Sequence, residues 1–427
     1  MIIKIAVLSA FVPRFYGHIL SISGLYWKEK EKKGKMKNNN KKIAIVHYTY
    51  PPVIGGVESV IQNHARILTK NGYRVKIITG EGGKDEKIDV KVIPQLTSLT
   101  LIDEYLDRKI KRGILPNRFY QLKDEISSRL RDELKEVDIC IIHNIMTMHF
   151  NLPLTCALDE IIDKLSNNVK FYLWCHDCAL LNPSYTDDIP DRNLYPWNLL
   201  SKFNPKVNYI AISEVRKKQL ASLFSIDEDL IQVIPVGLEI KSFLNISDPV
   251  WNLAWDKGFF ESDLVMFFPS RMLKRKNYEL GIRVVREMKN RGKICRFVIT
   301  APPDPHNPKT NEYFSYLHDL SKKLDVEEEI VFLSDLKEHY GIKMDYNDIK
   351  ELYSICDVLF LTSTQEGFGI PLLEAGAKRM PVICTNIESL AEIAGDYALR
   401  IDFNQDISTI TTRILNYVES SSVFSMF

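Results

Sequence analysis

The feature that most constrains the fold is the alternation of short apolar runs with helical patterns along most of the chain. Short apolar runs without internal alternation are typical of parallel strands that are buried on both faces. Helices between them supply the crossovers that a parallel sheet requires. The strands are predicted in two series, at residues 43–47, 74–79, 138–142, 170–174, 208–212 and 231–234, and then at 264–268, 295–299, 330–333, 357–361 and 381–384.

Helical patterns fill the intervals between these runs. The two series predict an α/β protein with two Rossmann-like domains, at residues 41–240 and 241–427. A segment rich in turn residues, 235–258, is the expected boundary. Helices are predicted at residues 57–70, 119–135, 154–166, 214–224, 278–290, 312–323, 372–378 and 407–418.

Composition limits the class of protein further. At 427 residues the chain is long enough for two domains, each with its own hydrophobic core. The net charge of +1 gives no overall field that would attract nucleic acid. The 7 cysteines lack regular spacing and do not predict a disulfide framework, so we expect a cytoplasmic protein.

The first 40 residues are expected to form an N-terminal extension outside both domains. The longest uninterrupted apolar run within residues 2–27 is too short to span a bilayer, so this stretch predicts a signal-like or anchoring segment. The lysine-rich stretch that follows predicts a disordered tether. We favour the simpler interpretation that Met36 is the start residue, because it leads directly into the first predicted strand.

Two glutamates flank the start of one predicted helix. In the segment QEGFGIPLLEAGA, Pro371 suits the first turn of a helix, and Gly367 and Gly369 allow the preceding loop to approach a ligand closely. Glu366 then lies in this loop, and Glu374 lies about one turn inside the helix. Spacing alone favours the interpretation that these carboxylates only complement the helix dipole.

The string EGFGIPLLEA in this segment resembles the signature of the retaining glycosyltransferases of family 4, which have the GT-B fold. The resemblance implies two Rossmann-like domains whose parallel sheets face each other across a cleft. It implies that Glu366 contacts the donor sugar and that Glu374 contacts the ribose of the nucleotide. The backbone of Gly367, Phe368 and Gly369 is expected to contact sugar hydroxyls or phosphate.

A basic loop follows the first strand of the second series. Arg271 and Lys276 lie in the segment FFPSRMLKRKN. A guanidinium fork and an ammonium group can both bind a diphosphate and stabilise the charge that develops as it leaves. The resembled family has an arginine and a lysine at this spacing, which implies that these two residues bind the donor. Lys274 and Arg275 are expected to face solvent.

Three further candidates follow strands of the first series. Gly56 opens a predicted helix, where free N–H groups can face a phosphate or an acceptor oxygen. His143 and His176 end two strands, where an imidazole can bind a sugar hydroxyl or move a proton. Such residues are often only structural, but the resembled family has similar residues in these places. We expect His176 to contact the donor sugar or the acceptor, with Asp177 orienting it and His143 as a second candidate.

No metal site and no resident cofactor are expected. Cys175 and Cys178 form a Cys-x-x-Cys pair, but no second pair with ligand spacing supports zinc or redox chemistry, so structural thiols are favoured. The resembled family needs no metal, and its nucleotide sugar is a co-substrate. The basic segment 108–112 is interpreted as a solvated helix face, with contact to an acidic membrane surface as the alternative.

The resemblance therefore implies a hexosyltransferase that moves a hexose from a UDP- or GDP-sugar to an acceptor hydroxyl with retention of configuration. The expected acceptor is a carbohydrate or a lipid-linked sugar, met in the cytoplasm or at the inner face of the membrane. The alternatives are a catalytically silent sugar-nucleotide-binding protein, or a phosphorylase or epimerase on the same scaffold. Arg379 stands where many family members have glycine. Members usually continue with a final helix, so the second domain is expected to be short at its end.

Overall fold

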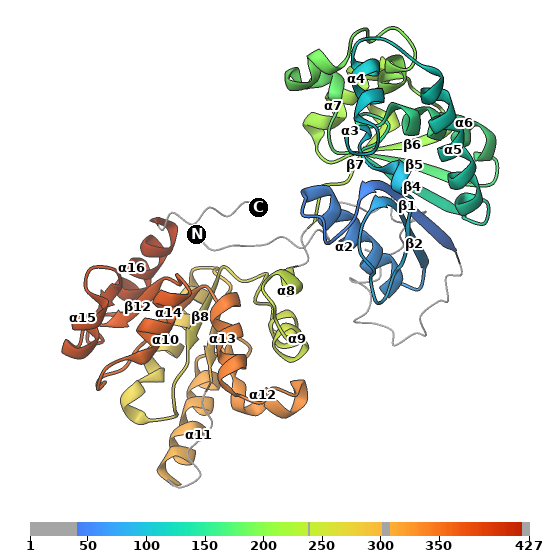
Figure 1. Cartoon of the computed structure of the whole chain (residues 1–427). Coiled ribbons are helices and arrows are strands. Elements are labelled where there is room, and N and C mark those ends of the chain that lie inside the picture. The colour runs from blue at the N-terminus through green and yellow to red at the C-terminus, as the bar shows by residue number, and fades with distance from the viewer. Residues whose placement is uncertain (1–40, 238–239, 301–307, 421–427) are drawn as a thin grey trace. The chain divides into compact units, whose positions relative to one another are not determined.

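The computed structural model describes residues 41–237, 240–300 and 308–420. The chain divides into two compact units on either side of residues 238–239, and each unit is described by itself (Figure 1). The expectations for the N-terminal extension and for the end of the chain lie outside the described residues.

The first unit is built on a seven-stranded sheet in the order β3-β2-β1-β4-β5-β6-β7. Neighbouring strands pair in parallel throughout. The strand order changes direction between β1 and β4, and open parallel sheets bind ligands at such a point, outside the carboxyl ends of the strands. The strands are β1 (Lys42–Thr49), β2 (Arg74–Glu81), β3 (Asp89–Val92), β4 (Ile139–His143), β5 (Lys170–Cys175), β6 (Val207–Ala211) and β7 (Ile231–Val233).

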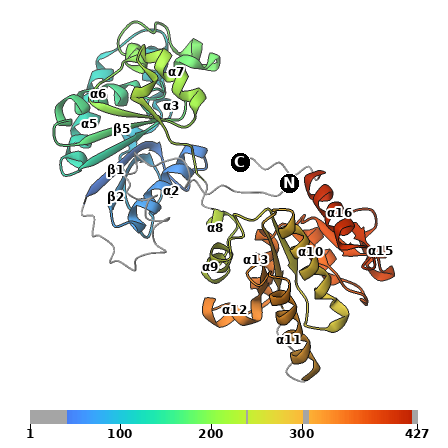
Figure 2. The same cartoon turned by 180° about the vertical axis from the view of Figure 1, so that it is seen from behind.

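Helices cover both faces of this sheet (Figure 2). Alternate residues of β1 show the reason, because Ile43 and Ile45 pack with α2 in one buried cluster while Ala44 and Val46 pack with α5 and α6 in another. The helices are α2 (Gly56–Lys70), α3 (Leu99–Ile102), α4 (Glu104–Lys111), α5 (Asn117–Leu134), α6 (Leu152–Leu165) and α7 (Glu214–Phe224), with short 3-10 turns η1 (Pro94–Leu96), η2 (Ala179–Leu181), η3 (Pro183–Asp188), η4 (Trp197–Ser201) and η5 (Glu228–Leu230).

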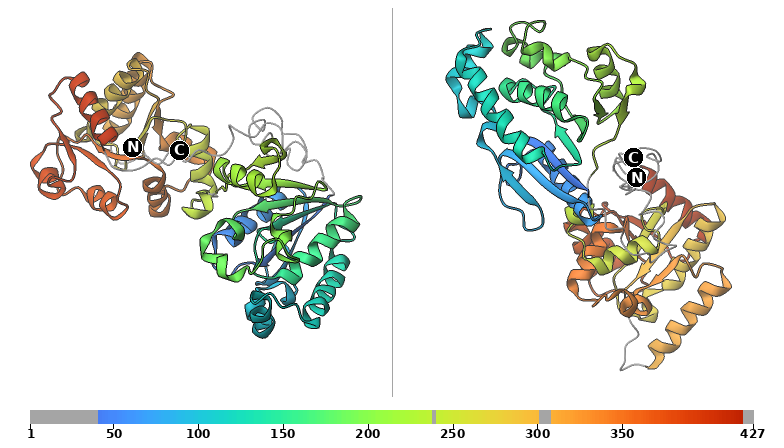
Figure 3. Two further views of the ribbon diagram at one scale, coloured as in Figure 1. Left: turned by 90° about the horizontal axis from the view of Figure 1, so that it is seen from above. Right: turned by 90° about the vertical axis from the view of Figure 1, so that its right-hand side faces the viewer.

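The second unit is built on a six-stranded sheet in the order β10-β9-β8-β11-β12-β13. Its strands also pair in parallel, and its helices surround the sheet in the views of Figure 3. The strands are β8 (Leu264–Phe268), β9 (Cys295–Ile299), β10 (Ile330–Phe332), β11 (Val358–Leu361), β12 (Val382–Thr385) and β13 (Leu399–Ile401).

One continuous apolar core holds the second unit together. Two helices, α8 (Ile240–Phe243) and α9 (Asp248–Asp256), occupy most of the segment that was expected to be a turn-rich boundary. Val250 and Leu253 of α9 are fully buried in this core, which explains the difference. The helices are α8 (Ile240–Phe243), α9 (Asp248–Asp256), α10 (Tyr278–Asn290), α11 (Pro308–Lys323), α12 (Leu333–Tyr340), α13 (Tyr346–Ile355), α14 (Ile370–Ala377), α15 (Glu388–Ala394) and α16 (Ile407–Ser420), with the 3-10 turn η6 (Lys274–Lys276).

The α/β class and the two Rossmann-like domains are confirmed by these two parallel sheets. Two strands, β3 and β13, were not predicted from the sequence. Three of the four residues of β3 are exposed, and β13 contributes only one fully buried residue, so neither has a continuous apolar run.

Candidate active site

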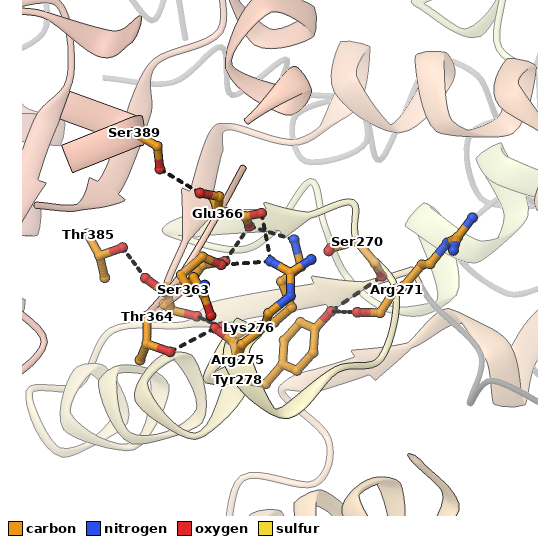
Figure 4. A network of polar contacts seen from close by, with 12 residues as sticks. Ser270, Arg271, Arg275, Lys276, Tyr278, Ser363, Thr364, Glu366, Thr385 and Ser389 are labelled. Atoms are coloured by element: carbon orange, nitrogen blue, oxygen red, sulfur yellow. Dashed lines mark hydrogen bonds and ion pairs between the residues drawn. The ribbon is translucent and has the colours of Figure 1, made fainter. Parts of the chain in front are cut away.

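Glu366 lies at the centre of a cluster of charged and polar side chains in the second unit (Figure 4). Its Oε1 accepts hydrogen bonds from Lys276 Nζ at 2.5 Å and from Ser363 Oγ at 2.6 Å. Its Oε2 accepts a hydrogen bond from Arg275 Nη1 at 3.1 Å. The side chains of Glu366 and Lys276 are each 10% exposed, so solvent screens this ion pair only weakly.

Burial and charge act against each other on the protonation of this pair. Burial raises the pKa of the Glu366 carboxyl, but hydrogen bonds from Lys276 and Ser363 outweigh it, and the pKa lies below its usual value. Burial lowers the pKa of Lys276, and the hydrogen bond to Glu366 offsets this only in part. Glu366 is therefore held as a carboxylate, an acceptor of hydrogen bonds from hydroxyl groups.

Backbone hydrogen bonds tie the basic loop to the loop that carries Glu366. The carbonyl oxygen of Arg275 accepts a hydrogen bond from the Thr364 N–H at 2.8 Å. The Thr362 hydroxyl donates to the carbonyl oxygen of Lys276 at 2.9 Å. These loops follow β8 and β11, which are neighbours in the sheet, so the fold itself brings the two sequence motifs together.

Arg271 and Arg275 differ in how their side chains lie relative to Glu366. The side chain of Arg271 is exposed and extends away from Lys276 and Glu366, while its carbonyl oxygen accepts a hydrogen bond from Tyr278 Oη at 3.0 Å (Figure 4). Arg275, expected to face solvent alone, has a side chain that is 41% exposed and still donates to Glu366. The structure thus joins Lys276 to Glu366 and corrects the expectation for Arg275.

The turn into α14 requires glycine at one position. Gly369 has φ +95, and a Cβ there would lie 2.6 Å from Leu390 Cδ2. Gly367 has open space where a Cβ would lie, and Phe368 is 54% exposed. Pro371 stands in the first turn of α14, as predicted. Gly367 and Phe368 are therefore exposed to a ligand, whereas Gly369 is buried.

Glu374 lies inside α14 and is held from a second helix. Its Oε2 accepts a hydrogen bond from Tyr353 Oη of α13 at 2.7 Å. Burial, followed by this hydrogen bond, raises the pKa of Tyr353, so the phenol stays protonated and donates. The contact fixes the direction of the Glu374 carboxylate, which also interacts with the Tyr346 hydroxyl.

Histidines gather at the carboxyl ends of β1, β4 and β5 in the first unit. His143 is fully buried, and its Nδ1 lies 3.0 Å from His176 Nε2. The His47 Nδ1 lies 2.8 Å from the His143 carbonyl oxygen, and the His64 ring packs against Trp174 with centroids 4.4 Å apart. The structure thus brings the two predicted histidines together and places His143 behind His176.

Burial keeps these four imidazoles neutral. It lowers the pKa of His64 to about 4 and that of His176 to about 3, and it lowers the pKa values of His47 and His143 as well. A neutral imidazole can accept a hydrogen bond on one ring nitrogen and donate one from the other. The contact with His143, rather than the predicted contact with Asp177, orients the His176 ring. The Asp177 carboxylate instead accepts a hydrogen bond from Arg216 at 3.2 Å.

The predicted anion site at Gly56 already faces a carboxylate. α2 begins at Gly56, and Glu58 folds back over this helix start, because a Cβ on Gly55 would lie only 2.0 Å from Glu58 Oε2. Thr49 donates a short hydrogen bond to Glu58 Oε1. A second anion at the N–H groups of this helix would therefore meet the charge of Glu58.

Cys175 and Cys178 are free and buried. Burial raises the pKa of both thiols, to about 11 for Cys178, so neither is a ready thiolate. Among the described residues, no group of three or more histidine, cysteine, aspartate or glutamate side chains is arranged to hold a metal ion. In the same parts of the chain, no helix has the length and apolarity needed to cross a membrane.

Comparison with known proteins decides the family. The family model described as Glycosyl transferases group 1 matches residues 250–422, and the model described as Glycosyltransferase Family 4 matches residues 54–242. The chain belongs to glycosyltransferase family 4. An uncharacterized glycosyltransferase from Methanocaldococcus jannaschii is 26% identical over 359 residues, covering 82% of each chain.

Two further proteins are similar to this glycosyltransferase at lower identity. The mannosylglucosylglycerate synthase of Thermotoga maritima is 21% identical over 368 residues and covers 81% of each chain. A solved structure of a protein from Anabaena in complex with UDP and glucose is 18% identical, covers 89% of this chain and 90% of that chain, and has a TM-score of 0.33.

Several residues of this candidate site were not predicted from the sequence. Arg275, Ser363 and Tyr353 hold the two predicted glutamates, and His47 and His64 pack around the predicted histidines. The position of His47 near the end of the first predicted strand was an available signal, equivalent to that of His143. Tyr353 gave no such signal, because it belongs to a helix, α13, that was not predicted.

Proposed function

We propose that this glycosyltransferase transfers a hexose from a nucleotide sugar to an acceptor hydroxyl with retention of anomeric configuration. The observation that carries the proposal is the contact of Glu366 with Lys276 at 2.5 Å, reinforced by Arg275. A carboxylate that accepts hydroxyl hydrogen bonds thus adjoins a cation suited to a diphosphate. A donor consisting of a hexose and a nucleoside diphosphate needs both groups side by side.

In this proposal the second unit binds the donor. Glu374 binds the ribose, Lys276 and Arg271 bind the diphosphate, and Glu366 binds the hexose hydroxyls. The bond between the anomeric carbon and the diphosphate oxygen breaks, and a bond to the acceptor oxygen forms on the same face of the sugar. An oxygen of the leaving phosphate takes the acceptor proton, so no enzyme nucleophile and no metal ion are required. Preorganised cations stabilise the negative charge that develops on the leaving group.

The first unit is proposed to bind the acceptor. His176 presents a neutral imidazole whose ring His143 orients, so it can accept a hydrogen bond from a sugar hydroxyl. The acceptor is proposed to be a carbohydrate or a lipid-linked sugar. The names of several relatives contain mannose, among them the O-antigen chain mannosyltransferase RfbU of Salmonella typhimurium, so mannose is the first donor sugar to test.

We also propose that the surface of α3 and α4 contacts an anionic membrane, which suits an enzyme with a lipid-linked acceptor. Leu101 is 71% and Tyr105 is 65% exposed, and the side chains of Arg108 and Arg112 are exposed nearby in sequence. Exposed apolar side chains beside cations are typical of interfacial helices. All 7 cysteines are free, which supports a location in the cytoplasm at the inner face of the membrane.

A donor screen followed by product analysis tests the proposed activity. Thermal shifts with UDP- and GDP-sugars, GDP-mannose first, should identify one stabilising donor. Arg271→Ala should weaken its binding, whereas Arg283→Ala, an exposed arginine on α10, should not. A labelled donor, incubated with EDTA and an acceptor panel, should yield a glycoside with retained configuration. Phosphorolysis, epimerisation or donor binding without turnover on any acceptor would instead establish the corresponding alternative.

A further inference from the structure

A cavity of about 580 Å³ opens in the second unit beside the cluster around Glu366. Its volume falls within the range of roughly 300–1,000 Å³ that small-molecule sites occupy. Five of its lining residues are polar or charged and the sixth is aromatic, which differs from a packing defect inside an apolar core. The lining residues are Lys274, Arg275, Asn277, Glu279, Thr364 and Phe403.

The two cations of this cavity differ in their partners. Arg275 Nη1 donates to the Gln365 carbonyl oxygen at 2.7 Å and to Glu366 at 3.1 Å, so its charge is largely matched. Lys274 is exposed, and no hydrogen bond or ion pair of its side chain is found among the described residues. The cavity therefore carries one unmatched positive charge, which favours a ligand with an anionic group.

The remaining lining residues suit a polyhydroxylated ring. Glu279 accepts a hydrogen bond from Tyr313 Oη at 2.5 Å and retains a second carboxylate oxygen for a hydroxyl donor. Asn277 sits at φ +52, so its backbone direction is fixed at the start of α10. Phe403, which follows β13 and is 37% exposed, offers an apolar ring face to the C–H groups of a sugar.

We propose that this cavity is a subsite for a sugar that carries an anionic group, a phosphate or a carboxylate. Lys274 binds the anionic group, Phe403 stacks on the ring, and Glu279 and Asn277 bind hydroxyls. Because Arg275 lines the cavity and also holds Glu366, a sugar bound there lies next to the proposed reactive carboxylate. The inference rests on the proposed function in one respect, that it takes Glu366 to be the carboxylate that contacts the donor hexose; the anionic sugar is a further ligand of the second unit.

Ligand-observed NMR on the full chain tests the subsite with glucose 6-phosphate, glucuronate, glucose and inorganic phosphate as probes. We expect glucose 6-phosphate and glucuronate to bind, and their relative affinities to show whether the subsite prefers a phosphate or a carboxylate. Glucose should bind at least about tenfold more weakly than the better of these two. Lys274→Ala should weaken the anionic probes about tenfold, and Phe403→Ala should weaken all the sugars. Lys323→Ala, an exposed lysine at the end of α11, is the matched control and should change nothing.

Two results would overturn the subsite. The first is that the wild type and Lys274→Ala bind every sugar probe equally well. The second is that Lys274→Ala loses as much affinity for UDP as for glucose 6-phosphate, which would show that Lys274 binds the donor. Donor turnover measured in the same preparations separates this failure from failure of the proposed function. An enzyme that transfers hexose but binds no anionic sugar keeps the function and loses the subsite.

Discussion

Glu366 is the residue on which the proposed chemistry depends most directly. Glu366→Gln keeps the shape of the side chain but removes its negative charge, so turnover should fall about 100- to 1,000-fold, as when one preorganised polar contact to the reacting group is lost. Initial rates at saturating donor measure this, with the exposed Glu392→Gln as a control. The urea midpoint should fall modestly, because the mostly buried Lys276 ammonium group loses its counter-charge, while the apolar core is unchanged. Rates like those of the wild type would remove Glu366 from the mechanism.

Arg275 is expected to act through Glu366 as a positioning residue. One guanidinium nitrogen, Nη1, donates to the Gln365 carbonyl oxygen and to Glu366 together. Arg275→Ala should lower kcat about tenfold while the donor KM changes less than threefold, and Arg275→Lys should recover part of kcat. Steady-state kinetics of the two variants measure the split. A donor KM that rises as much as kcat falls would show that Arg275 binds the donor instead.

The turn after α14 constrains the backbone conformation of the residue that occupies it. Arg379 stands at φ +54, a left-handed conformation that costs an L-residue about 1 kcal/mol and glycine almost nothing. Arg379→Gly should therefore raise the free energy of unfolding of the second unit by about 0.5 kcal/mol after the greater freedom of glycine in the unfolded chain is allowed for. Arg379→Ala removes the same side chain but keeps Cβ, so it should give no gain in urea unfolding.

The strand ends of the first unit should make that unit sensitive to acid. His64 and His176 have pKa values of about 4 and about 3 in the folded chain, against about 6.5 when unfolded. Below pH 6.5 the unfolded chain binds more protons, so stability is full above that pH and falls as the pH drops. These two groups should together remove about 2–3 kcal/mol by pH 5.5.

Urea titrations at pH 7.5 and pH 5.5 measure this acid sensitivity. His64→Gln should recover about 1 kcal/mol of the loss at the lower pH. Glutamine does not titrate, so this position no longer binds a proton in the unfolded chain that it cannot bind in the folded chain. A wild-type chain with the same unfolding free energy at both pH values would show that burial does not hold these rings neutral.

Elements with continuous apolar runs were predictable from the sequence, and those without them were not. β8 and β9 were predicted with the bounds that the structure gives, because every residue of β8 and all but one of β9 are buried. α13 was missed although Asp345 caps its start, because the helix has only 10 residues and its apolar pattern is short. Because α13 was not predicted, Tyr353 and its hydrogen bond to Glu374 were not predicted either.

The site was predictable as a set of residues but not as a set of contacts. The motifs placed Lys276 and Glu366 in loops after strands, and sheet topology then required them to lie close together. Nothing in the sequence distinguished Arg275 from Lys274, since both stand in one run of basic residues. The partner of Arg275 lies 91 positions away, and only the folded chain reveals it.

For the whole molecule, the proposed membrane contact makes a prediction about location. Vesicles that contain anionic lipid should sediment the wild-type chain, whereas neutral vesicles should not, because Arg108 and Arg112 add about 1 kcal/mol each near an anionic surface. Arg108→Glu with Arg112→Glu should abolish sedimentation and leave donor binding unchanged. Equal sedimentation of this variant would show that α4 is only a solvated helix face.

The ion pair of Lys276 with Glu366 also limits which ligands can bind to either residue. A free diphosphate that bound Lys276 would leave the mostly buried Glu366 carboxylate without this cation. A free hexose that bound Glu366 would leave the mostly buried Lys276 ammonium group without its anion. Only a molecule that brings an anion and hydroxyls together can exchange both partners in one step. Inorganic phosphate and free sugars should consequently leave this ion pair intact, whereas the intact activated sugar should displace it in a single step.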